Sequence, residues 1–320
     1  MNQFGMATKP PASNNLNSKA QSLLRNMNSV LVGQDKSARL ASVALLAGGH
    51  LIIEDVPGVG KTLLAKSLAM SIHGSFKRLQ CTPDLLPADV SGVNIYDQKE
   101  GVFKFVPGPV FSNIFLADEI NRASPRTQSS LLESMEERQV TTDGVTRGLP
   151  ELFFVIATAN PIEQLGTFPL PEAQLDRFMI ALSLGYPNHQ EEAQILMKTM
   201  VEDSFVCKPI LTVEEVLEAR QAVRSVRVHE ALVKYIIDIS TATRNHHAVI
   251  LGVSPRGSQQ LLRASQALAF LEGRDYVTPD DIKRLAPPVF GHRIIPKVKS
   301  QRISYADIVE RVLETVPVPK

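Results

Sequence analysis

Two kinds of residue are scarce in this sequence. It has no tryptophan, which excludes no function, and only two cysteines among its 320 residues. Cys81 and Cys207 lie far apart along the chain, and their spacing is not typical of metal ligands. We therefore expect two ordinary buried thiols in a protein of a reducing compartment.

A strong net charge and long hydrophobic runs are also missing. The formal net charge of +1 gives no reason to expect strong attraction to nucleic acid or to an acidic membrane. The longest apolar stretch, "VALLAGGHLII" at 43–53, is too short to cross a bilayer. The polar first residues contain no apolar segment of the kind found in secretory signals. These absences predict a cytoplasmic protein without a transmembrane segment.

The sequence does have enough apolar residues for a large core, since 44% are hydrophobic and 21% are charged. From about residue 19 to 185, strand-length apolar runs alternate with helical patterns, which predicts an α/β domain with a buried parallel sheet. The five runs are "HLIIE", "FKRLQCT", "NIFLAD", "LFFVIATA" and "FMIALSL". Over 186–320 several helical patterns begin at Ser or Thr caps, which predicts a helical domain. Residues 1–18 are expected to form a flexible tail.

Two segments interrupt the α/β alternation. Residues 93–106, "VNIYDQKEGVFKFV", contain two short strand patterns around a polar turn. Residues 139–147, "QVTTDGVTR", have strand patterns around Asp143-Gly144, a dipeptide that favours a tight hairpin turn. Both segments are predicted to be β-hairpins that project from the body, with ordinary surface loops as the alternative.

The stretch "EDVPGVGKT" at 54–62 follows a predicted strand and opens a predicted helix. It matches a phosphate-binding loop except that Asp55 replaces the first glycine. Gly58 and Gly60 allow backbone N–H groups to surround phosphate oxygens, and the helix N-terminus favours negative charge. In such a loop Lys61 bridges the β- and γ-phosphates, and the Thr62 hydroxyl holds Mg²⁺.

Two further strands end in polar residues. "NIFLADEINR" ends in Asp118, placed to hold Mg²⁺, and Glu119, placed to polarise a water for attack on the γ-phosphate. "LFFVIATANP" delivers Asn160 to the same edge of the sheet, although an asparagine before proline is also a common turn residue. Because the guanine-reading pattern N-K-x-D is absent, adenine is the favoured base.

These motifs together resemble those of the MoxR-type AAA+ ATPases. The resemblance covers about residues 20–317, and the matching stretches keep the family's order. They are "VLVGQ" (30–34), "EDVPGVGKT" (54–62), "TPDLLPADVSG" (82–92), "ADEINRA" (117–123), "QSSLLESMEERQVT" (128–141), "ATANPIEQLGTFPLPEAQLDRF" (157–178), "GVSPRG" (252–257) and "GRDYVTPDDI" (273–282).

The resemblance implies an AAA+ P-loop core with parallel sheet order 5-1-4-3-2, two hairpin inserts and a C-terminal all-helical lid. It implies that Val32 and Gly33 contact adenine, that Asn160 is the sensor-1 residue and that Arg256 is the sensor-2 residue. Arg177 resembles the finger that reaches a neighbouring subunit's γ-phosphate. The residues expected to bind nucleotide in the loop are Pro57, Gly58, Val59, Gly60, Lys61, Thr62 and Leu63. An aspartate at position 55 is familiar in the family. The segment "FGHRI" near the end departs from the family pattern, and we assign it no role.

The function implied by the resemblance is hydrolysis of ATP, with Mg²⁺, to remodel, mature or assemble client proteins or metal-cofactor complexes. A homo-oligomeric ring, most simply a hexamer, is expected because the finger acts between subunits, and a von Willebrand A-domain protein is the expected partner. The client is not encoded in any motif. One alternative is a nucleic-acid motor, which the balanced hairpin charges disfavour. Another is a nucleotide-gated binding module with little turnover, which the intact Lys61, Asp118 and Glu119 disfavour.

Overall fold

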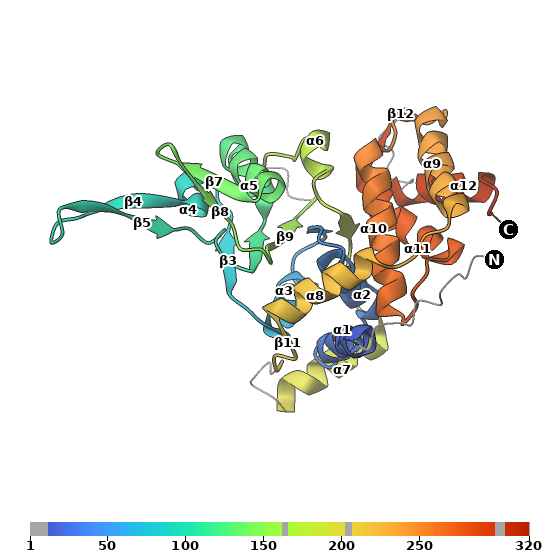
Figure 1. Ribbon diagram of the computed structural model, residues 1–320, viewed down its shortest axis with the longest axis horizontal. Coiled ribbons are helices and arrows are strands. Elements are labelled where there is room, and N and C mark those ends of the chain that lie inside the picture. Colours follow the sequence, from blue (N-terminus) through green and yellow to red (C-terminus); the bar gives the residue numbers. More distant parts are fainter. Residues whose placement is uncertain (1–11, 162–165, 202–206, 298–304, 320) are drawn as a thin grey trace, which may run out of the picture.

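The computed structural model describes residues 12–161, 166–201, 207–297 and 305–319. A sheet with flanking helices forms the body of the molecule. A long hairpin projects from one side of this body, and a group of C-terminal helices lies on the other side (Figure 1). In the described ranges no helix has the length and hydropathy needed to cross a membrane.

The central sheet has five strands, all paired in parallel. Its strands are β1 (Leu51–Glu54), β3 (Phe76–Gln80), β6 (Ile114–Asp118), β9 (Phe154–Ala159) and β10 (Ile180–Leu182). They lie side by side in the order β10-β1-β9-β6-β3, which is 5-1-4-3-2 when these strands are counted along the chain. The predicted sheet order is therefore confirmed. Helices cover both faces over β1, β6, β9 and β10, which are mostly buried, whereas β3 at the edge of the sheet is largely exposed.

Alternate residues of the strands point to opposite faces of the sheet and belong to two hydrophobic cores. Leu51 and Ile53 of β1 belong to the larger core, and Ile52 between them belongs to the smaller one. The larger core packs against α1, α2, α3 and the C-terminal helices, and the smaller core packs against α5. The helices of the body are α1 (Ala12–Asn28), α2 (Asp35–Leu46), α3 (Lys61–Met70), α4 (Pro87–Ser91), α5 (Pro125–Glu137) and α6 (Glu172–Leu175), with a short 3-10 turn η1 (Ile120–Arg122) and strand β2 (Ile72–His73).

Both predicted hairpins are present. Strands β4 (Gly92–Asp97) and β5 (Val102–Pro107) form the long arm in Figure 1, and β7 (Gln139–Thr142) pairs with β8 (Val145–Gly148). Asp143 and Gly144 both have positive φ, 52° and 75°, as the tight turn requires. The two hairpins touch each other, since Asn94 Nδ2 donates to Asp143 Oδ2 at 2.6 Å.

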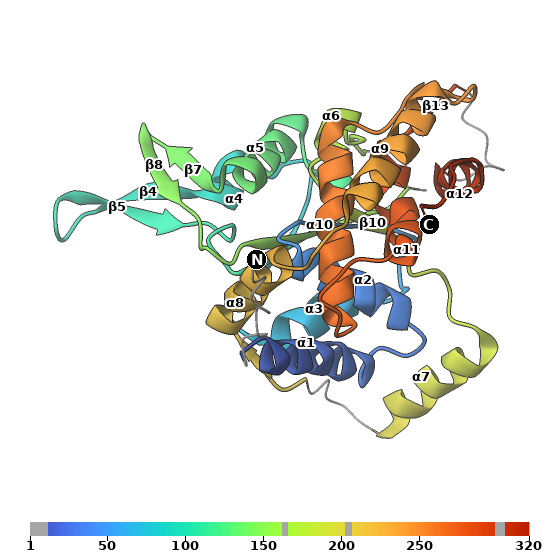
Figure 2. The ribbon, with the colours of Figure 1, turned by 45° about the vertical axis from the view of Figure 1, so that its right-hand side comes forward.

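The C-terminal part is mainly helical and contains three strands of two or three residues. Its elements are α7 (His189–Val201), β11 (Leu211–Thr212), α8 (Val213–Arg224), α9 (Glu230–Asn245), β12 (Val249–Leu251), α10 (Pro255–Leu271), α11 (Pro279–Phe290), η2 (Gly291–Arg293), β13 (Ile295–Pro296) and α12 (Tyr305–Thr315). Ser or Thr caps are present as predicted: Thr212, Ser254 and Thr278 each accept a hydrogen bond from the backbone N–H three residues later. Figure 2 shows α7 set apart from the cluster formed by α9 to α12.

The predicted flexible tail is too long. Helix α1 begins at Ala12, so residues 12–18 are helical, and the rest of the predicted tail lies outside the described residues. The polar residues at the start of α1 do not indicate a helix. Further along the same helix, Leu23 and Met27 are fully buried in the larger core. Contacts with α2, α3 and α8 hold this helix, which its own composition does not predict.

Candidate active site

The phosphate-loop motif occupies the turn between β1 and α3. Gly58 and Gly60 have φ values of +85° and +96°, in the left-handed region that favours glycine. Apart from the adjoining residues, no atom lies within 4 Å of the position where a Cβ would stand at either glycine, so the space there is open. Pro57 and Leu63 are exposed, while Val59 is half-buried beside the turn. This is the shape of a backbone cradle for an anion.

Lys61 lies at the base of this cradle and is buried. Its Nζ donates to the Asp55 carbonyl at 2.7 Å and lies 3.5 Å from the Ala159 carbonyl at the end of β9. The ammonium group is thus held by neutral acceptors and keeps its charge available to an anion in the turn.

Asp118 lies next to the cradle, at the end of β6. The Thr62 hydroxyl is 3.4 Å from Asp118 Oδ2, and the Thr158 hydroxyl donates to Asp118 Oδ1 at 2.6 Å. A hydroxyl and a carboxylate so placed are the hard oxygen ligands that Mg²⁺ takes. Arg78 of β3 also donates to Oδ2, from Nη2 at 2.7 Å and from Nε at 3.0 Å. Arg78 is not among the predicted site residues.

Glu119 follows with a left-handed backbone, φ 57° and ψ 51°, which is uncommon for a residue with a side chain. This conformation turns the chain away from the strand direction, and the Glu119 N–H donates to the Thr158 hydroxyl at 2.8 Å. The carboxylate accepts from Gln80 Nε2 at 2.8 Å and from Arg122 Nη1 at 3.0 Å. Its position is therefore fixed by donors from β3 and from η1.

Asn160 lies at the same edge of the sheet, directly after β9, and is buried. Its backbone is paired with Asn121, whose Nδ2 donates to the Asn160 carbonyl at 3.1 Å. The preceding residue, Ala159, also accepts from the Asp55 N–H at 3.1 Å. The structure therefore brings Lys61, Thr62, Asp118, Glu119 and Asn160 to one edge, as the sequence predicts.

Asp55, the departure from the usual loop sequence, has a structural role. Its Oδ2 accepts from the Ser183 hydroxyl and from the Leu184 and Gly185 N–H groups at 2.6–2.8 Å. Burial acts to raise the pKa of the Asp55 carboxyl, but these bonds and one from Val56 outweigh burial and leave its pKa below the ordinary 3.8. The carboxylate thus ties the start of the phosphate loop to the chain that leaves β10.

Val32 and Gly33 lie in the turn between α1 and α2. An added Cβ at Gly33, whose φ is +70°, would stand 2.3–2.7 Å from the Glu191 carboxyl group at the start of α7. Gln34 also donates to the Leu184 carbonyl at 3.2 Å. This turn therefore faces the chain after β10, close to the segment held by Asp55.

Arg177 and Arg256 are not at that edge. Arg177 Nε lies 3.1 Å from one carboxylate oxygen of Glu136, and Arg256 Nη1 lies 2.9 Å from the other. All three side chains are partly exposed, between 26% and 39%. The structure thus joins two residues far apart in the sequence through Glu136, near the end of α5, which the sequence analysis did not single out.

The direction of the strands separates the two groups. β10 is parallel to β1, with Ile180 beside Leu51, and Arg177 precedes β10 whereas Lys61 follows β1. At a rise of about 3.3 Å per residue, the four steps from Leu51 to Asp55 alone span ~13 Å. The phosphate loop and the arginine pair therefore occupy opposite edges of the sheet.

Arg293 connects the arginine pair to the helical lid. Its side chain is 2% exposed, and its Nε donates to Asp176 Oδ1 at 2.7 Å. The Ser254 hydroxyl, the cap of α10, lies 3.2 Å from the same carboxylate. The "FGHRI" segment, which received no role from the sequence, therefore fixes the residue before Arg177 against the start of the helix that carries Arg256.

Sequence reasoning missed Arg78 and Gln80, although a signal for them existed. They are two residues apart on β3 and so point to the same face, and Gln80 is in register with Asp118. The predicted order 5-1-4-3-2 already places β3 beside β6, the strand that ends in Asp118, and this was the signal. Glu136 and Arg293 carry no such local signal, because only the tertiary packing brings them to Arg177.

Two family descriptions match the sequence. Residues 50–180 match the ATPase family associated with various cellular activities (AAA), and residues 241–312 match the AAA lid domain. The first range contains the sheet and the phosphate loop, and the second contains α10 and α11.

Individual proteins are similar over nearly the whole chain. YeaC of Bacillus subtilis is 49% identical over 92% of this chain and 93% of its own length. Chaperone MoxR1 of Mycobacterium tuberculosis is 41% identical over 91% of this chain and 80% of its own length. The crystal structure of a candidate ATPase from Cytophaga hutchinsonii superposes with a TM-score of 0.89 at 39% identity, and the match covers 96% of this chain and 97% of that one.

Asp55→Asn tests the structural role of the Asp55 carboxylate. We expect the free energy of unfolding near neutral pH to fall by about 1–3 kcal/mol, because a charged acceptor with several donors is lost. The pKa of Asp55 is lower in the folded than in the unfolded chain, so its stabilisation is complete above its ordinary 3.8 and disappears as the pH falls through the folded value. Urea titrations should therefore show the two proteins converging below about pH 4.

Asp238→Asn is the matched control, since Asp238 is exposed on α9. It should change the free energy of unfolding by less than about 0.5 kcal/mol at any of these pH values. A difference between wild type and Asp55→Asn that stays constant down to pH 3, or that is absent at pH 7, would contradict the role assigned to Asp55.

Proposed function

The chain belongs to the MoxR family of AAA+ ATPases, and we propose that it uses ATP hydrolysis to remodel, mature or assemble client proteins or metal-cofactor complexes. The observation that carries this proposal is that the phosphate loop and the two arginines are separated within one chain. A phosphate cradle with two carboxylates lies at one edge of the sheet, and two partly exposed arginines lie at the other. A complete site then needs two copies of the chain.

In this proposal the phosphate loop holds ATP. Backbone N–H groups of residues 58–63 surround the phosphates beside Pro57, and Lys61 turns its ammonium group from the Asp55 carbonyl toward them. Thr62 and Asp118 are placed to hold Mg²⁺, which when bound neutralises charge on the phosphate oxygens. Val32 and Gly33 contact the adenine, from the turn that faces the chain after β10.

Glu119 is the proposed general base. It orients a water in line with the γ-phosphorus, and Asn160 hydrogen-bonds that water or the γ-phosphate. In the structure Gln80 and Arg122 both donate to Oε2 of its carboxylate, which leaves Oε1 to accept a proton from water. Gln80 is therefore a positioning residue that orients the base.

Arg177 and Arg256 would act on the nucleotide of a neighbouring subunit. The ~13 Å of sheet between the two edges prevents Arg177 from serving its own phosphate loop. An arginine supplied to a transferring phosphoryl group stabilises the negative charge of the transition state and is worth ~10³–10⁵ in rate. A closed ring repeats this contact at every interface, and a hexamer is the ring that the family resemblance implies.

A protein client is favoured over nucleic acid by the surface of the hairpins. The β4–β5 arm exposes six large apolar side chains by 44–71%: Val93, Ile95, Tyr96, Val102, Phe103 and Val106. Its Lys104 is paired with Asp97 and Glu100. Arg147 of the second hairpin stacks on Phe105, 3.9 Å from the ring centre.

This surface is apolar with neutralised charges, whereas a phosphate backbone requires free cations. The partner proposed from the family resemblance is a von Willebrand A-domain protein, in the cytoplasm.

Glu119→Gln separates an enzyme from a nucleotide-gated binding module. We expect steady-state phosphate release to fall by about 10²–10⁴, because the amide cannot accept the proton, while ATP affinity changes by less than about threefold. Phosphate release and equilibrium ATP binding are the two measurements. A variant that hydrolyses ATP at the wild-type rate would remove Glu119 from the mechanism.

The same variant serves to identify the client. With ATP bound and hydrolysis blocked, it should retain on a pull-down the partners that the cycling protein releases. A bound protein with a von Willebrand A domain would support the proposed partner. Recovery of DNA alone, or stimulation of the wild-type ATPase by DNA with steep salt dependence, would favour the nucleic-acid motor instead.

Arg177→Ala tests whether catalysis takes place between subunits. Alone it should lower phosphate release by about 10³-fold or more while ATP binding persists. Mixed in equal amounts with Lys61→Ala subunits, it should recover activity, since each inactive subunit supplies what its neighbour lacks. Random mixing with independent sites leaves one interface in four complete, so about a quarter of the wild-type rate is expected.

The same mixing scheme with Arg256→Ala tests whether Arg256 acts on the neighbouring nucleotide. A mixture of wild-type subunits with subunits that carry both Lys61→Ala and Arg177→Ala calibrates the exchange of subunits, since independent sites give half of the wild-type rate without exchange and a quarter with it. If the Arg177→Ala mixture stays inactive while that control shows exchange, Arg177 acts within its own subunit and the proposed geometry of the ring is wrong.

A further inference from the structure

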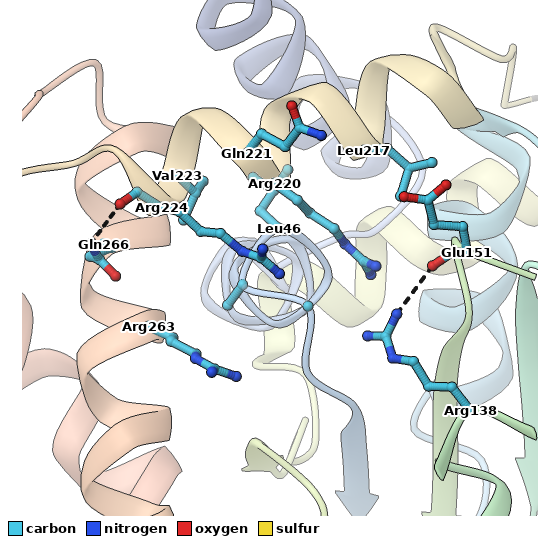
Figure 3. Close-up of a pocket in the computed structure, with 12 residues that line it drawn as sticks. Leu46, Arg138, Glu151, Leu217, Arg220, Gln221, Val223, Arg224, Arg263 and Gln266 are labelled. Carbon is cyan, nitrogen blue, oxygen red and sulfur yellow. Dashed lines mark hydrogen bonds between the residues drawn. The ribbon is translucent and has the colours of Figure 1, made fainter. Parts of the chain in front are cut away.

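A second charged site lies in a cavity of about 160 Å³ that is lined by α8, α10 and the loop before β1. Four arginines line it: Arg138, which follows α5, Arg220 and Arg224 of α8, and Arg263 of α10. Figure 3 shows their guanidinium groups directed into one shared space. We refer to these four residues, with Glu151 at the margin, as the arginine pocket.

Arg220 is the buried member of the pocket, only 8% exposed. Its Nε donates to the Leu45 carbonyl at 2.9 Å, but its Nη2 is inaccessible to solvent and has no partner among the described residues. Burial, with the nearby Arg138 and Arg224, lowers the pKa of Arg220 to about 10. A buried guanidinium nitrogen without an acceptor is unfavourable, so the hydrogen bonding of Arg220 is incomplete among the described residues.

The rest of the pocket increases the imbalance of charge. Four arginines against Glu151 leave a surplus of three positive charges, and none of the four forms a salt bridge within the described part of the chain. Arg138 Nη1 is directed to the backbone carbonyl of Glu151, at 3.2 Å, and not to its carboxylate. Arg220 and Arg224 are four residues apart on one helix, a spacing at which like charges repel.

We propose that the arginine pocket binds an oxyanion of the phosphate class, held by Arg220, Arg224 and Arg263. A guanidinium group presents up to five N–H donors in a planar fork that matches phosphate oxygens. A phosphate with two negative charges offsets most of the surplus and supplies an anion beside the buried Arg220 guanidinium group. The cavity holds the volume of about five waters, enough for a phosphate group and some of its hydration.

This site is separate from the nucleotide cradle. The pocket is lined by residues 46–48, which precede β1, whereas the phosphate loop follows β1. It therefore lies at the amino-terminal edge of the sheet, with the strand length between the two sites. The proposal does not depend on ATP hydrolysis, and either can fail without the other.

The test measures binding of inorganic phosphate by isothermal titration calorimetry at constant ionic strength. The full chain carries Lys61→Ala, which removes the phosphate affinity of the nucleotide loop. We expect one phosphate per subunit, and at least tenfold weaker binding when Arg224→Gln and Arg263→Gln are added. These two side chains are exposed, so their replacement leaves the core intact.

A charge-matched pair provides the control. Arg227→Gln with Arg284→Gln removes the same two charges from exposed positions outside the pocket, and phosphate binding should weaken less than twofold. Absence of saturable phosphate binding would overturn the proposal. Equal weakening by both pairs would also overturn it, because it would mean that the ion senses only the general field of the protein.

Arg220→Met tests the buried arginine by a second readout. Without phosphate this variant should melt at or above the temperature of its Lys61→Ala parent, because an unpaired buried charge is replaced by an apolar side chain of similar length. Added phosphate should raise the melting temperature of the parent but not that of the variant. A phosphate-dependent rise that survives in Arg220→Met would overturn the role of Arg220.

Two further measurements identify the source of the ligand. Tighter binding of ADP than of inorganic phosphate would mean that the phosphoryl group arrives on a nucleotide, and the reverse order would mean a free ion; both support the proposal. The competing occupant is a carboxylate of a second copy of the chain. If the Arg224→Gln, Arg263→Gln pair blocks assembly and the assembled wild type binds no phosphate, that occupant replaces the one proposed.

Discussion

The parallel direction of β1 and β10 is the constraint on which the rest of the structure depends. Because both strands run the same way, a loop that follows β1 and a segment that precedes β10 must lie at opposite edges of the sheet. The cradle built by Gly58, Gly60 and Lys61 and the arginine at position 177 cannot meet within one chain. In the proposed mechanism the second cation of the phosphate site is therefore supplied by a neighbouring subunit.

Two buried or partly buried carboxylates transmit this geometry to the loops. Asp55 fixes the phosphate loop to the chain leaving β10, and Asp176 fixes the start of Arg177's segment to the lid through Arg293 and Ser254. Both ends of β10 are therefore fastened, one to the nucleotide cradle and one to the helix that carries Arg256. If the lid shifts during the nucleotide cycle, Arg177 and Arg256 would move together.

The parts of the fold that were predictable are those specified by local sequence. Buried strands appear as apolar runs, Ser254 and Thr278 mark helix starts, and Asp143-Gly144 marks a hairpin, since each depends on neighbours in sequence. Asp118 and Glu119 were predictable for the same reason, because they stand at the end of an apolar run in the sequence. What could not be predicted depends on packing: the early turns of α1, the hold of Arg78 on Asp118, and the contacts of Glu136 and Arg293.

The distribution of arginines shows why a net charge of +1 misleads. Glu136 engages two arginines at once, and Asp176 neutralises Arg293 in the interior, so these cations are matched where they lie. Arg138, only two residues after Glu136, belongs instead to a group of four with one carboxylate nearby. The overall balance thus results from matched pairs in some regions and a local surplus in another. Of these four arginines only Arg220 is buried, and the anion proposed above would offset its charge from solution.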